Sequence, residues 1–302
     1  MEYPNGKRYY PYAQYLRQRY GGRVAKIPLD GGFTCPNRDG TKGIGGCAYC
    51  SARGSGDFVC GDDLEQQFSA YAAGLTKWQP VGYIPYFQAF TGTYAPVGRL
   101  RTLYDRALAL PDAVGLSVAT RPDCVPEEVA DLLAEYAQRT DVTVELGVQT
   151  VHDRTARAMN LCHGFADFEQ ALERLQKRDI PVCVHLINGL PGETREDMVE
   201  SARTVGGMGI QSVKLHLLHI LKHTALSHLT EADCLSMEDY VGVVCDQLEV
   251  LPPEVVIQRL TGDGKGADLI APQWSRNKRA VLNAIDREMA RRDAWQGDRR
   301  EG

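Results

Sequence analysis

Residues 34–50 read TCPNRDGTKGIGGCAYC and place Cys35, Cys47 and Cys50 in a C-x11-C-x2-C pattern. The closely spaced pair can hold two thiolates on one soft metal centre, and the third cysteine returns across a glycine-rich loop. Three thiolates on a [4Fe–4S] cube leave one iron without a protein ligand, and that open iron can bind a small molecule. Cys60 follows nearby and would instead complete a four-thiolate zinc site, so two kinds of metal centre are open at this point.

The bulk composition predicts a globular protein rather than a membrane or secreted one. The chain has 302 residues, 43% of them hydrophobic, and a formal net charge of −5. A full core is therefore available, and the molecule as a whole is no electrostatic binder of nucleic acid. No apolar run reaches the roughly 18 residues of a membrane span, and the N-terminus lacks an apolar signal core. We expect a cytoplasmic protein with no membrane partner.

The cysteine count supports metal binding over disulfides. Nine cysteines are an odd number, and in a reducing compartment ligation of a metal is the better interpretation for the clustered ones. We interpret the scattered ones as small buried hydrophobic residues, with Cys162 as the one possible exception.

Strand-like and helix-like stretches alternate along the chain, which predicts a parallel sheet with crossover helices. Runs rich in Val, Ile and Leu occupy 24–30, 83–90, 114–120, 142–149, 182–189, 212–219 and 255–262. Apolar residues at three- and four-residue spacing occupy 62–75, 126–139, 165–178 and 194–205. Thr194, with Asp197 three residues later, marks the start of the last of these helices.

Two architectures fit this alternation, a doubly wound sheet and a partial (β/α) barrel of the TIM type. No G-x-G-x-x-G follows the first strand, so the dinucleotide-binding sheet loses its main support. Polar residues instead gather at the predicted carboxyl ends of strands, where a barrel places its site: Thr91, Thr93, Thr120, Arg121, Glu145, Gln149, Asn188 and His219. We predict a partial barrel over residues 24–262, flanked by an N-terminal extension (1–23) and a helical C-terminal extension (263–302) whose last residues are disordered.

The N-terminal extension combines tyrosines with cations. Six tyrosines, interleaved with arginines and lysines, lie in the first twenty residues: Tyr3, Tyr9, Tyr10, Tyr12, Tyr15 and Tyr20. Aromatic rings that stack on bases, beside cations that hold phosphates, suit RNA. An amphipathic helix that caps the barrel explains the same pattern, and both interpretations stay open.

The cysteine pattern, with Tyr49 between its last two members, resembles the cluster loop of radical S-adenosylmethionine (radical SAM) enzymes, whose usual spacing is C-x3-C-x2-C. The longer first gap is similar to that of the Elongator catalytic-subunit family, which acts on the wobble uridine of tRNA. ATRPDC (119–124), VELGVQT (144–150) and GLPGET (189–194) resemble further segments of that family. GGFTCPNRDG, FQAFTGTYAP and LIAPQWSRNKRAVLNAID resemble a short bacterial family without an acetyltransferase domain.

The resemblance implies a barrel of the radical SAM kind with a [4Fe–4S] cluster on Cys35, Cys47 and Cys50 and S-adenosylmethionine on the open iron. Its partners would be a tRNA and an electron donor such as flavodoxin or ferredoxin. The implied reaction converts a carboxymethylaminomethyl side chain on wobble uridine towards the aminomethyl form.

The resemblance also implies roles for single residues in binding the cofactor. Thr91 and Thr93 occupy the place where the superfamily holds the methionine amino group, although its usual acidic motif is absent here. Glu145 suits the ribose hydroxyls, with a salt bridge at the core edge as the alternative.

Further contacts are implied beyond this strand. Gln149 and Arg157 would reach the ribose or the methionine carboxylate, unless Arg157 is a solvated helix residue. Thr120 and Arg121 would contact cofactor or substrate. The segment HLING (185–189), through Ile187, would lie on the adenine side.

Three histidines lie near the end of the sixth predicted strand, and two rival functions remain. In a strand His216 and His219 point to opposite faces, so with His223 they form no metal triad by spacing, while Lys214 shares the face of His216. These are candidate substrate contacts. The rivals are a radical enzyme that acts on a small metabolite and a four-cysteine zinc protein that binds RNA.

Overall fold

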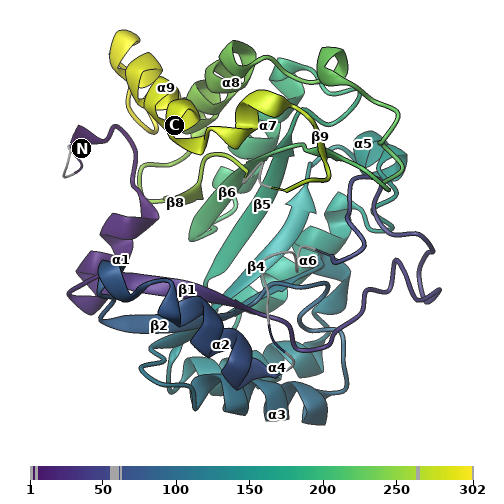
Figure 1. The fold of residues 1–302 in the computed structure, drawn as a ribbon, viewed down its shortest axis with the longest axis vertical. Coiled ribbons are helices and arrows are strands. Elements are labelled where there is room, and N and C mark those ends of the chain that lie inside the picture. The colour runs from purple at the N-terminus through teal and green to yellow at the C-terminus, as the bar shows by residue number, and fades with distance from the viewer. Residues whose placement is uncertain (1–2, 4–5, 55–60, 62, 263–265, 301–302) are drawn as a thin grey trace.

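Seven strands within the described residues form one parallel sheet in the order β1-β2-β3-β4-β5-β6-β8. The computed structural model describes residues 3, 6–54, 61, 63–262 and 266–300. The sheet curls so that β1 and β8 both face the same side of the molecule, and helices cover its outer surface (Figure 1). This is a partial (β/α) barrel, as predicted. Its strands are β1 (Val24–Leu29), β2 (Gly82–Phe87), β3 (Gly115–Thr120), β4 (Asp141–Gln149), β5 (Val182–Asn188), β6 (Ser212–Leu217) and β8 (Val256–Arg259).

Each of the seven predicted strands is present, within a few residues of its expected bounds. An additional antiparallel pair, β7 (Ile220–Leu221) with β9 (Leu269–Ala271), lies beyond β6. The predicted helices are also present, as α2 (Leu64–Ala73), α4 (Glu127–Ala137), α6 (Phe165–Gln176) and α7 (Arg195–Gly206). Thr194 and Asp197 form the expected capping box at the start of α7.

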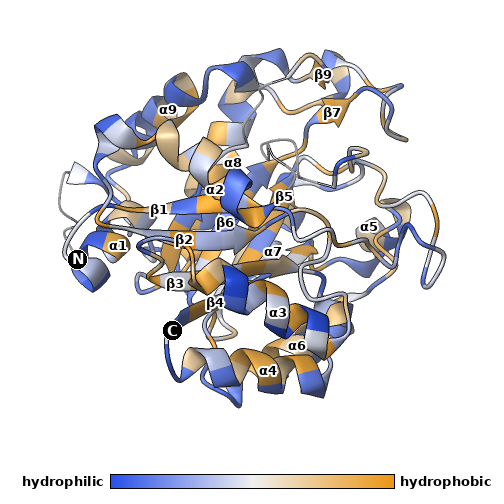
Figure 2. Ribbon diagram, turned by 60° about the horizontal axis from the view of Figure 1, so that its bottom comes forward, coloured by the Kyte–Doolittle hydropathy of each residue, from blue (hydrophilic) through white to orange (hydrophobic). Residues whose placement is uncertain are grey.

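Helix α1 (Tyr12–Tyr20) lies in the N-terminal extension, where an amphipathic helix was one of the two interpretations. Three other helices are not among those that periodicity predicts: α3 (Val97–Leu108), α5 (Asp153–Ala158) and α8 (Met237–Val250). In α8 every residue from Tyr240 to Val250 is buried, because the helix is packed between α7 and α9 (Lys278–Arg291). A helix without a solvated face shows no amphipathic period. Figure 2 shows hydrophobic residues concentrated on the strands and polar ones on the helices. None of the described helices has the length and apolar composition of a membrane span.

Short 3-10 turns connect several of these elements, at η2 (Thr76–Trp78), η3 (Pro122–Cys124), η4 (Glu231–Asp233) and η5 (Gln273–Arg276).

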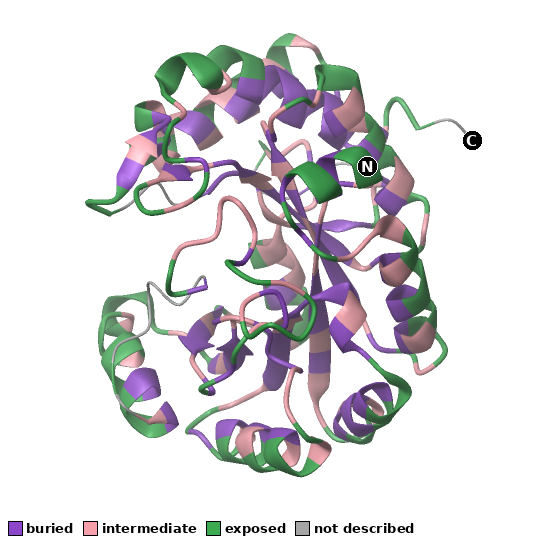
Figure 3. Ribbon diagram, turned by 90° about the vertical axis from the view of Figure 1, so that its right-hand side faces the viewer, coloured by how far each residue is buried: buried purple, intermediate pink, exposed green. Residues whose placement is uncertain are grey.

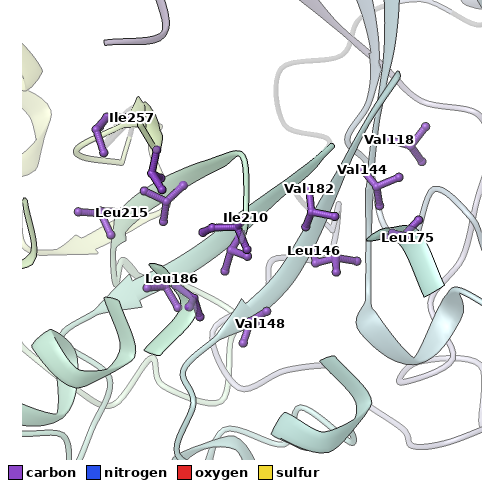
Figure 4. Packing of buried hydrophobic residues seen from close by; sticks show 14 of the residues in the cluster. Val118, Val144, Leu146, Val148, Leu175, Val182, Leu186, Ile210, Leu215 and Ile257 are labelled. Carbon is purple, nitrogen blue, oxygen red and sulfur yellow. The ribbon is translucent and has the colours of Figure 1, made fainter. Parts of the chain in front are cut away.

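The two faces of the sheet have opposite character, because successive side chains on a strand point to opposite sides. On β4 the residues Val144, Leu146 and Val148 point outward and pack among Leu175 of α6 and other buried residues (Figure 4). Strands and the inner helix faces are buried, while the outer helix faces are exposed (Figure 3). The alternate residues of β4, beginning with Glu145, face the inside of the barrel and line a cavity there.

The N-terminal segment packs against the open edge of the barrel. Pro11 forms a parallel bridge with Ile257 of β8, and the amide of Ile257 donates to the carbonyl of Tyr10 at 2.8 Å. Helix α1 contacts both β1 and β8 (Figure 1). Tyr3 and Tyr9 are buried. These contacts favour the capping interpretation for the tyrosines of this segment.

The C-terminal segment packs against the barrel as far as Arg299, whose amide donates to the carbonyl of Glu249 at 2.8 Å, and the expected disorder of the last residues stays a prediction. Gln296 is buried, donates from Nε2 to the carbonyls of Pro252 at 2.6 Å and Val255 at 2.8 Å, and accepts from the amide of Tyr10. Both extensions therefore share contacts with each other and with the barrel. Residues 301 and 302 lie outside the described part of the chain.

Helix α9 should unfold together with the barrel. Ile285 is fully buried in the main core, so Ile285→Ala should lower the free energy of unfolding by about 2–4 kcal/mol through lost burial and a residual cavity. Asn283→Ala, on the exposed side of the same helix, is the control and should change it little. Urea denaturation followed by circular dichroism measures both. A separate early transition for α9, with the main midpoint unchanged, would contradict this expectation.

One buried carboxylate connects the inner faces of six strands. Glu145 on β4 is fully buried, and its two oxygens bond to side chains from β1, β2, β3, β5 and β6. The partners are Lys26, Ser117 (2.9 Å), Tyr86 (2.7 Å), His185 (2.7 Å) and Lys214. Burial alone would raise the pKa of Glu145, but Lys214 and Lys26 outweigh it and hold the pKa well below its usual range.

Removal of this charge should destabilise the barrel strongly. Glu145→Gln leaves two buried ammonium groups without their counter-ion, and we expect a loss of about 3–5 kcal/mol in the free energy of unfolding. Glu173→Gln is the control, because the pair of Glu173 with Lys177 is largely exposed, and it should have no measurable effect. Urea denaturation at pH 7 compares the two.

The effect of Glu145→Gln should also depend on pH. Folding lowers the pKa of Glu145 below its ordinary value of 4.5, so its ionised form stabilises the fold above that pH. The stability difference between wild type and variant should decrease as the pH falls below that value. Equal stability of the two proteins at pH 7 would refute the role of the ion network.

Candidate functional site

A cavity of about 740 Å³ lies inside the barrel, at the carboxyl ends of the strands. The cluster loop, residues 35–50, forms one wall and contributes Cys35, Cys47 and Cys50. The inner faces of the strands form the floor, which includes Glu145 and Lys214. The position agrees with the site expected for a barrel of this kind.

Backbone hydrogen bonds hold the two ends of the cluster loop in tight turns. The amide of Cys50 donates to the carbonyl of Cys47 at 2.9 Å, and the amide of Arg38 donates to that of Cys35 at 2.8 Å. The guanidinium of Arg38 then reaches across to the carbonyls of Cys50 at 3.2 Å and Ser51 at 2.6 Å. The eleven residues between Cys35 and Cys47 are therefore spanned by a side chain as well as by backbone.

A second residue anchors the loop to the segment after α5. Asn37 donates from Nδ2 to the sulfur of Cys47 at 3.6 Å and to the carbonyl of Asn160 at 2.5 Å. Cys162 donates to Oδ1 of Asn37 at 3.0 Å. A Cβ on Gly43 would lie 2.4 Å from that Oδ1. The close approach of Asn37 therefore favours glycine at position 43.

The donor set fits an iron–sulfur cluster with an open iron. Among the described residues of the cavity wall, the cysteines are Cys35, Cys47 and Cys50. Burial raises the pKa of the Cys47 thiol to about 11, and the neighbouring Cys50 and Cys35 act in the same direction. Three sulfurs within electrostatic reach of one another are stabilised as thiolates by a shared cationic centre. Cys60, the fourth ligand of the zinc alternative, lies outside the described residues.

Two buried polar atoms in the cavity wall have no hydrogen-bond partner within the described structure. They are Oγ1 of Thr91, just beyond β2, and Nε2 of His216 on β6. Because a buried polar group without a partner is costly, both atoms mark places where a bound ligand supplies the missing bond. Thr91 is one of the residues expected to contact the methionine amino group, and a hydroxyl can accept that bond.

Four more residues expected at the cofactor line the same cavity: Tyr49, Thr120, Glu145 and Gln149. Burial, then the neighbouring Cys47 and Cys50, raise the pKa of Tyr49 well above its usual value, which places its hydroxyl beside the cysteines. Gln149 ends β4 with a φ of 71°, a left-handed conformation uncommon outside glycine. Both oxygens of Glu145 accept hydrogen bonds from protein side chains. The contacts of Glu145 therefore agree with the salt-bridge alternative, and its role at the ribose stays a prediction.

Three expected cofactor contacts lie away from the cavity lining. The hydroxyl of Thr93 bonds to Oγ1 of Thr120 at 2.5 Å and to the carbonyl of Cys124 at 2.6 Å. Arg157 is exposed on α5, and Ile187 packs in a small hydrophobic cluster with Tyr49. Their cofactor roles stay predictions.

The TRPD segment forms a rigid ion pair at the rim of the cavity. Arg121 donates from Nε and Nη2 to the two oxygens of Asp123, each at 2.9 Å. Lys42 of the cluster loop bonds to the same carboxylate at 2.8 Å. Arg121 lines the cavity, so this pair connects the loop to the carboxyl end of β3.

His216, His219 and His223 all line the cavity, and the arrangement expected for the first two needs correction. His216 and His219 were expected on opposite faces, but β6 ends at Leu217. His219 lies in the turn that follows, where strand alternation no longer holds. Lys214 and His216 do share the inner face, as predicted.

The floor of the cavity is strongly basic, and some of the residues in and beside it were not predicted from the sequence. Arg259 on β8 lines the cavity in register with Lys214 on β6. Lys26 and Tyr86 were likewise missed, although each is an inward position of its strand by the period-two rule. Burial, Lys26 and Arg259 lower the pKa of Lys214 to about 8, against the attraction of Glu145. Burial and Lys214 lower the pKa of His185 to about 4.

Glu145, Cys183 and His185 offer ligand atoms within 4.8 Å of one another, but their surroundings oppose a metal ion. Lys26 and Lys214 already bond to both oxygens of Glu145. Burial raises the pKa of Cys183 to about 11, which keeps its thiol protonated. We interpret this group as a hydrogen-bonded network.

Comparisons with known proteins agree with this site. Residues 35–205 match the Radical SAM superfamily, and residues 210–291 match the Radical_SAM C-terminal domain. The second match crosses the boundary expected at 262/263. The protein YtqA of Bacillus subtilis is 50% identical over 297 residues, which cover 96% of this chain and 92% of YtqA.

Two further likenesses cover less of the other protein. The structure of archaeal Elp3 from Methanocaldococcus infernus superposes with a TM-score of 0.67 at 16% identity and shares the fold, over 90% of this chain and 64% of that one. A tRNA uridine(34) acetyltransferase of Methanocaldococcus jannaschii is 34% identical over 84 residues, or 28% of this chain and 15% of that protein. The family matches, the identity with YtqA and the three clustered thiols show that this chain belongs to the radical SAM superfamily, whose members bind a [4Fe–4S] cluster and S-adenosylmethionine.

Proposed function

We propose that this protein is a cytoplasmic radical SAM enzyme that modifies the wobble uridine of tRNA, converting a carboxymethylaminomethyl side chain towards the aminomethyl form. The observation that carries the proposal is one cavity that joins three clustered thiols, an unpartnered buried threonine hydroxyl and a basic floor. The partial similarity to a tRNA uridine(34) acetyltransferase supports the substrate. An electron donor such as flavodoxin or ferredoxin would deliver the reducing electron.

The chain's own residues perform three tasks in this reaction. Cys35, Cys47 and Cys50 would hold the cluster, and Asn37 and Arg38 would keep their loop closed around it. Thr91 and Gln149 would bind the cofactor from the strand ends. When bound, the cluster and S-adenosylmethionine would supply radical chemistry that removes one hydrogen atom from the carboxymethyl carbon. Loss of one further electron, with S-adenosylmethionine as the net two-electron oxidant, and addition of water would then release the carboxymethyl group as glyoxylate and leave the aminomethyl group.

Strands position the floor of the cavity. Glu145, His185 and Lys214 come from β4, β5 and β6, and rigid elements hold reacting groups more accurately than loops.

The metal assignment is tested by two cysteine variants. After anaerobic reconstitution, wild type and Cys60→Ala should each bind about four irons with four sulfides and release 5′-deoxyadenosine in the presence of a reductant. Cys47→Ala should lose most of the iron and at least about 100-fold of the cleavage rate, because one thiolate ligand is gone. Metal analysis and chromatography provide the readouts. One bound zinc that Cys60→Ala abolishes would establish the zinc alternative instead.

The tRNA assignment is tested by nucleoside analysis. Deletion of the gene should cause carboxymethylaminomethyl uridine to accumulate in tRNA at the expense of its aminomethyl derivatives, as measured by mass spectrometry of digested tRNA. The wild-type gene should restore the pattern, and the Cys47→Ala gene should not. An unchanged set of uridines in the deletion strain, with S-adenosylmethionine cleavage intact in the purified protein, would favour a small metabolite as substrate.

A further inference from the structure

The inner face of the barrel carries more positive than negative charge. Lys26, Lys214 and Arg259 come from β1, β6 and β8, and all three lie beside the cavity floor or the groove next to it. Glu145 is the carboxylate among them, and it bonds to both lysines. Lys26 and Lys214 share this one buried carboxylate, so their two positive charges have one counter-ion among the described contacts, and this region favours an additional anion.

The two lysines differ in how far their donors are used. The ammonium of Lys26 bonds to Glu145, to Oγ of Ser117 at 3.2 Å and to Oε1 of Gln258 at 2.9 Å. These three bonds use its three donors. Lys214 bonds to Glu145 and to the hydroxyl of Tyr86 at 3.2 Å, which leaves one N–H for a ligand. Its side chain is 6% exposed, so its contact with bulk water is small.

Two neighbours complete a pocket around this remaining donor. His216 lies two residues after Lys214 on the same face, its ring 5.2 Å from that of His185, and its buried Nε2 has no partner in the described structure. Arg259 lies level with Lys214 on the adjacent strand and lines the cavity. Arg259 also contributes to lowering the pKa of both Lys214 and His216, which shows that the three groups are within electrostatic reach.

We propose that Lys214, Arg259 and His216 form a subsite for a carboxylate, and that Glu145 is a positioning residue that holds Lys214 in place. This proposal rests on the proposed function and deepens it. The carboxymethylaminomethyl side chain ends in a carboxylate, and the aminomethyl product does not. The subsite therefore recognises the part of the substrate that the reaction removes, and it releases the product because that anion is gone.

An anionic substrate has a route to this subsite. A groove of about 1200 Å³ runs beside α1, β1 and β8, and Lys214 and Arg259 line both the groove and the cavity. Arg17, Arg23 and Lys77 are on its walls, and the described residues that line it include no carboxylate. A basic groove without acidic residues concentrates anions such as the phosphates of RNA.

The carboxylate could also belong to the methionine part of the cofactor, so the experiment has separate arms for substrate and cofactor. The probes are two anticodon stem-loop RNAs, one with carboxymethylaminomethyl uridine and one with its methyl ester. Calorimetry measures their binding to the reconstituted holoenzyme, independent of turnover. Wild type should bind the acid about 10- to 100-fold more tightly than the ester, the range of one or two charge-assisted hydrogen bonds.

Variants then assign this discrimination to residues. Lys214→Met and Arg259→Gln should bind acid and ester equally, with unchanged affinity for S-adenosylmethionine, and Lys214→Arg should recover part of the discrimination. Lys222→Met is the control, because Lys222 is an exposed lysine at the cavity rim that bonds to the carbonyl of Ala267. It should retain the full preference for the acid. Thermal unfolding identifies any variant that fails to fold, and Arg259→Gln then replaces Lys214→Met.

Each remaining outcome decides a different point. Equal binding of acid and ester by wild type would overturn the subsite, even if the RNA is converted. A loss of affinity for S-adenosylmethionine in both variants, without a change in RNA discrimination, would assign the subsite to the cofactor carboxylate and overturn the substrate assignment. Discrimination in binding without any conversion would refute the proposed reaction and leave the subsite standing. Absence of binding of either RNA would overturn both.

Discussion

The buried charge of Glu145 is the constraint on which the inside of this barrel depends. A carboxylate removed from water must be hydrogen-bonded and paired with cations, and here five other strands supply the partners. These bonds require the sheet to curl, because β1 and β6 reach β4 only across the interior. They also keep the interior polar, whereas a closed barrel fills this space with layers of branched aliphatic residues. The ion network thus preserves a space that a ligand can occupy.

The strands could be predicted from sequence because their outward faces form the core. Two of these strands are recognisable by their β-branched and aliphatic residues, which pack in one cluster: Val144, Leu146 and Val148 of β4, and Val182, Val184 and Leu186 of β5. The inward residues carry no comparable signal. Lys26 bonds to Glu145 across 119 positions of the chain, and no local pattern reports which charges will meet. Helix α8 was not predicted for a related reason. Its residues from Tyr240 to Val250 are buried, and a buried helix lacks the solvated polar face that defines an amphipathic helix.

The cluster loop shows the same division between local and distant information. Its three cysteines are evident from spacing, because the ligands of one centre lie close in sequence. The residues that shape the loop around them are Asn37, Arg38 and Asn160. Asn37 and Asn160 bond the loop to the segment after α5, and Arg38 bonds to the carbonyl of Ser51. A Cβ at Gly46 would meet Nε of Arg38 at 2.8 Å. Side chains from within the long first gap therefore fill it and stabilise the loop.

Lys26 and Lys214 show how one carboxylate can support two different roles. Burial acts to lower the pKa of both lysines, and Glu145 acts to raise it. For Lys26 the attraction of Glu145, with Tyr12 and Cys183 acting in the same direction, outweighs burial, and the pKa is raised. For Lys214 the neighbouring cations Lys26 and Arg259 shift the balance, and its pKa falls to about 8. Lys26 is a satisfied structural partner. Lys214 carries a charge that the protein leaves incompletely compensated, and an anionic ligand is the group that would compensate it.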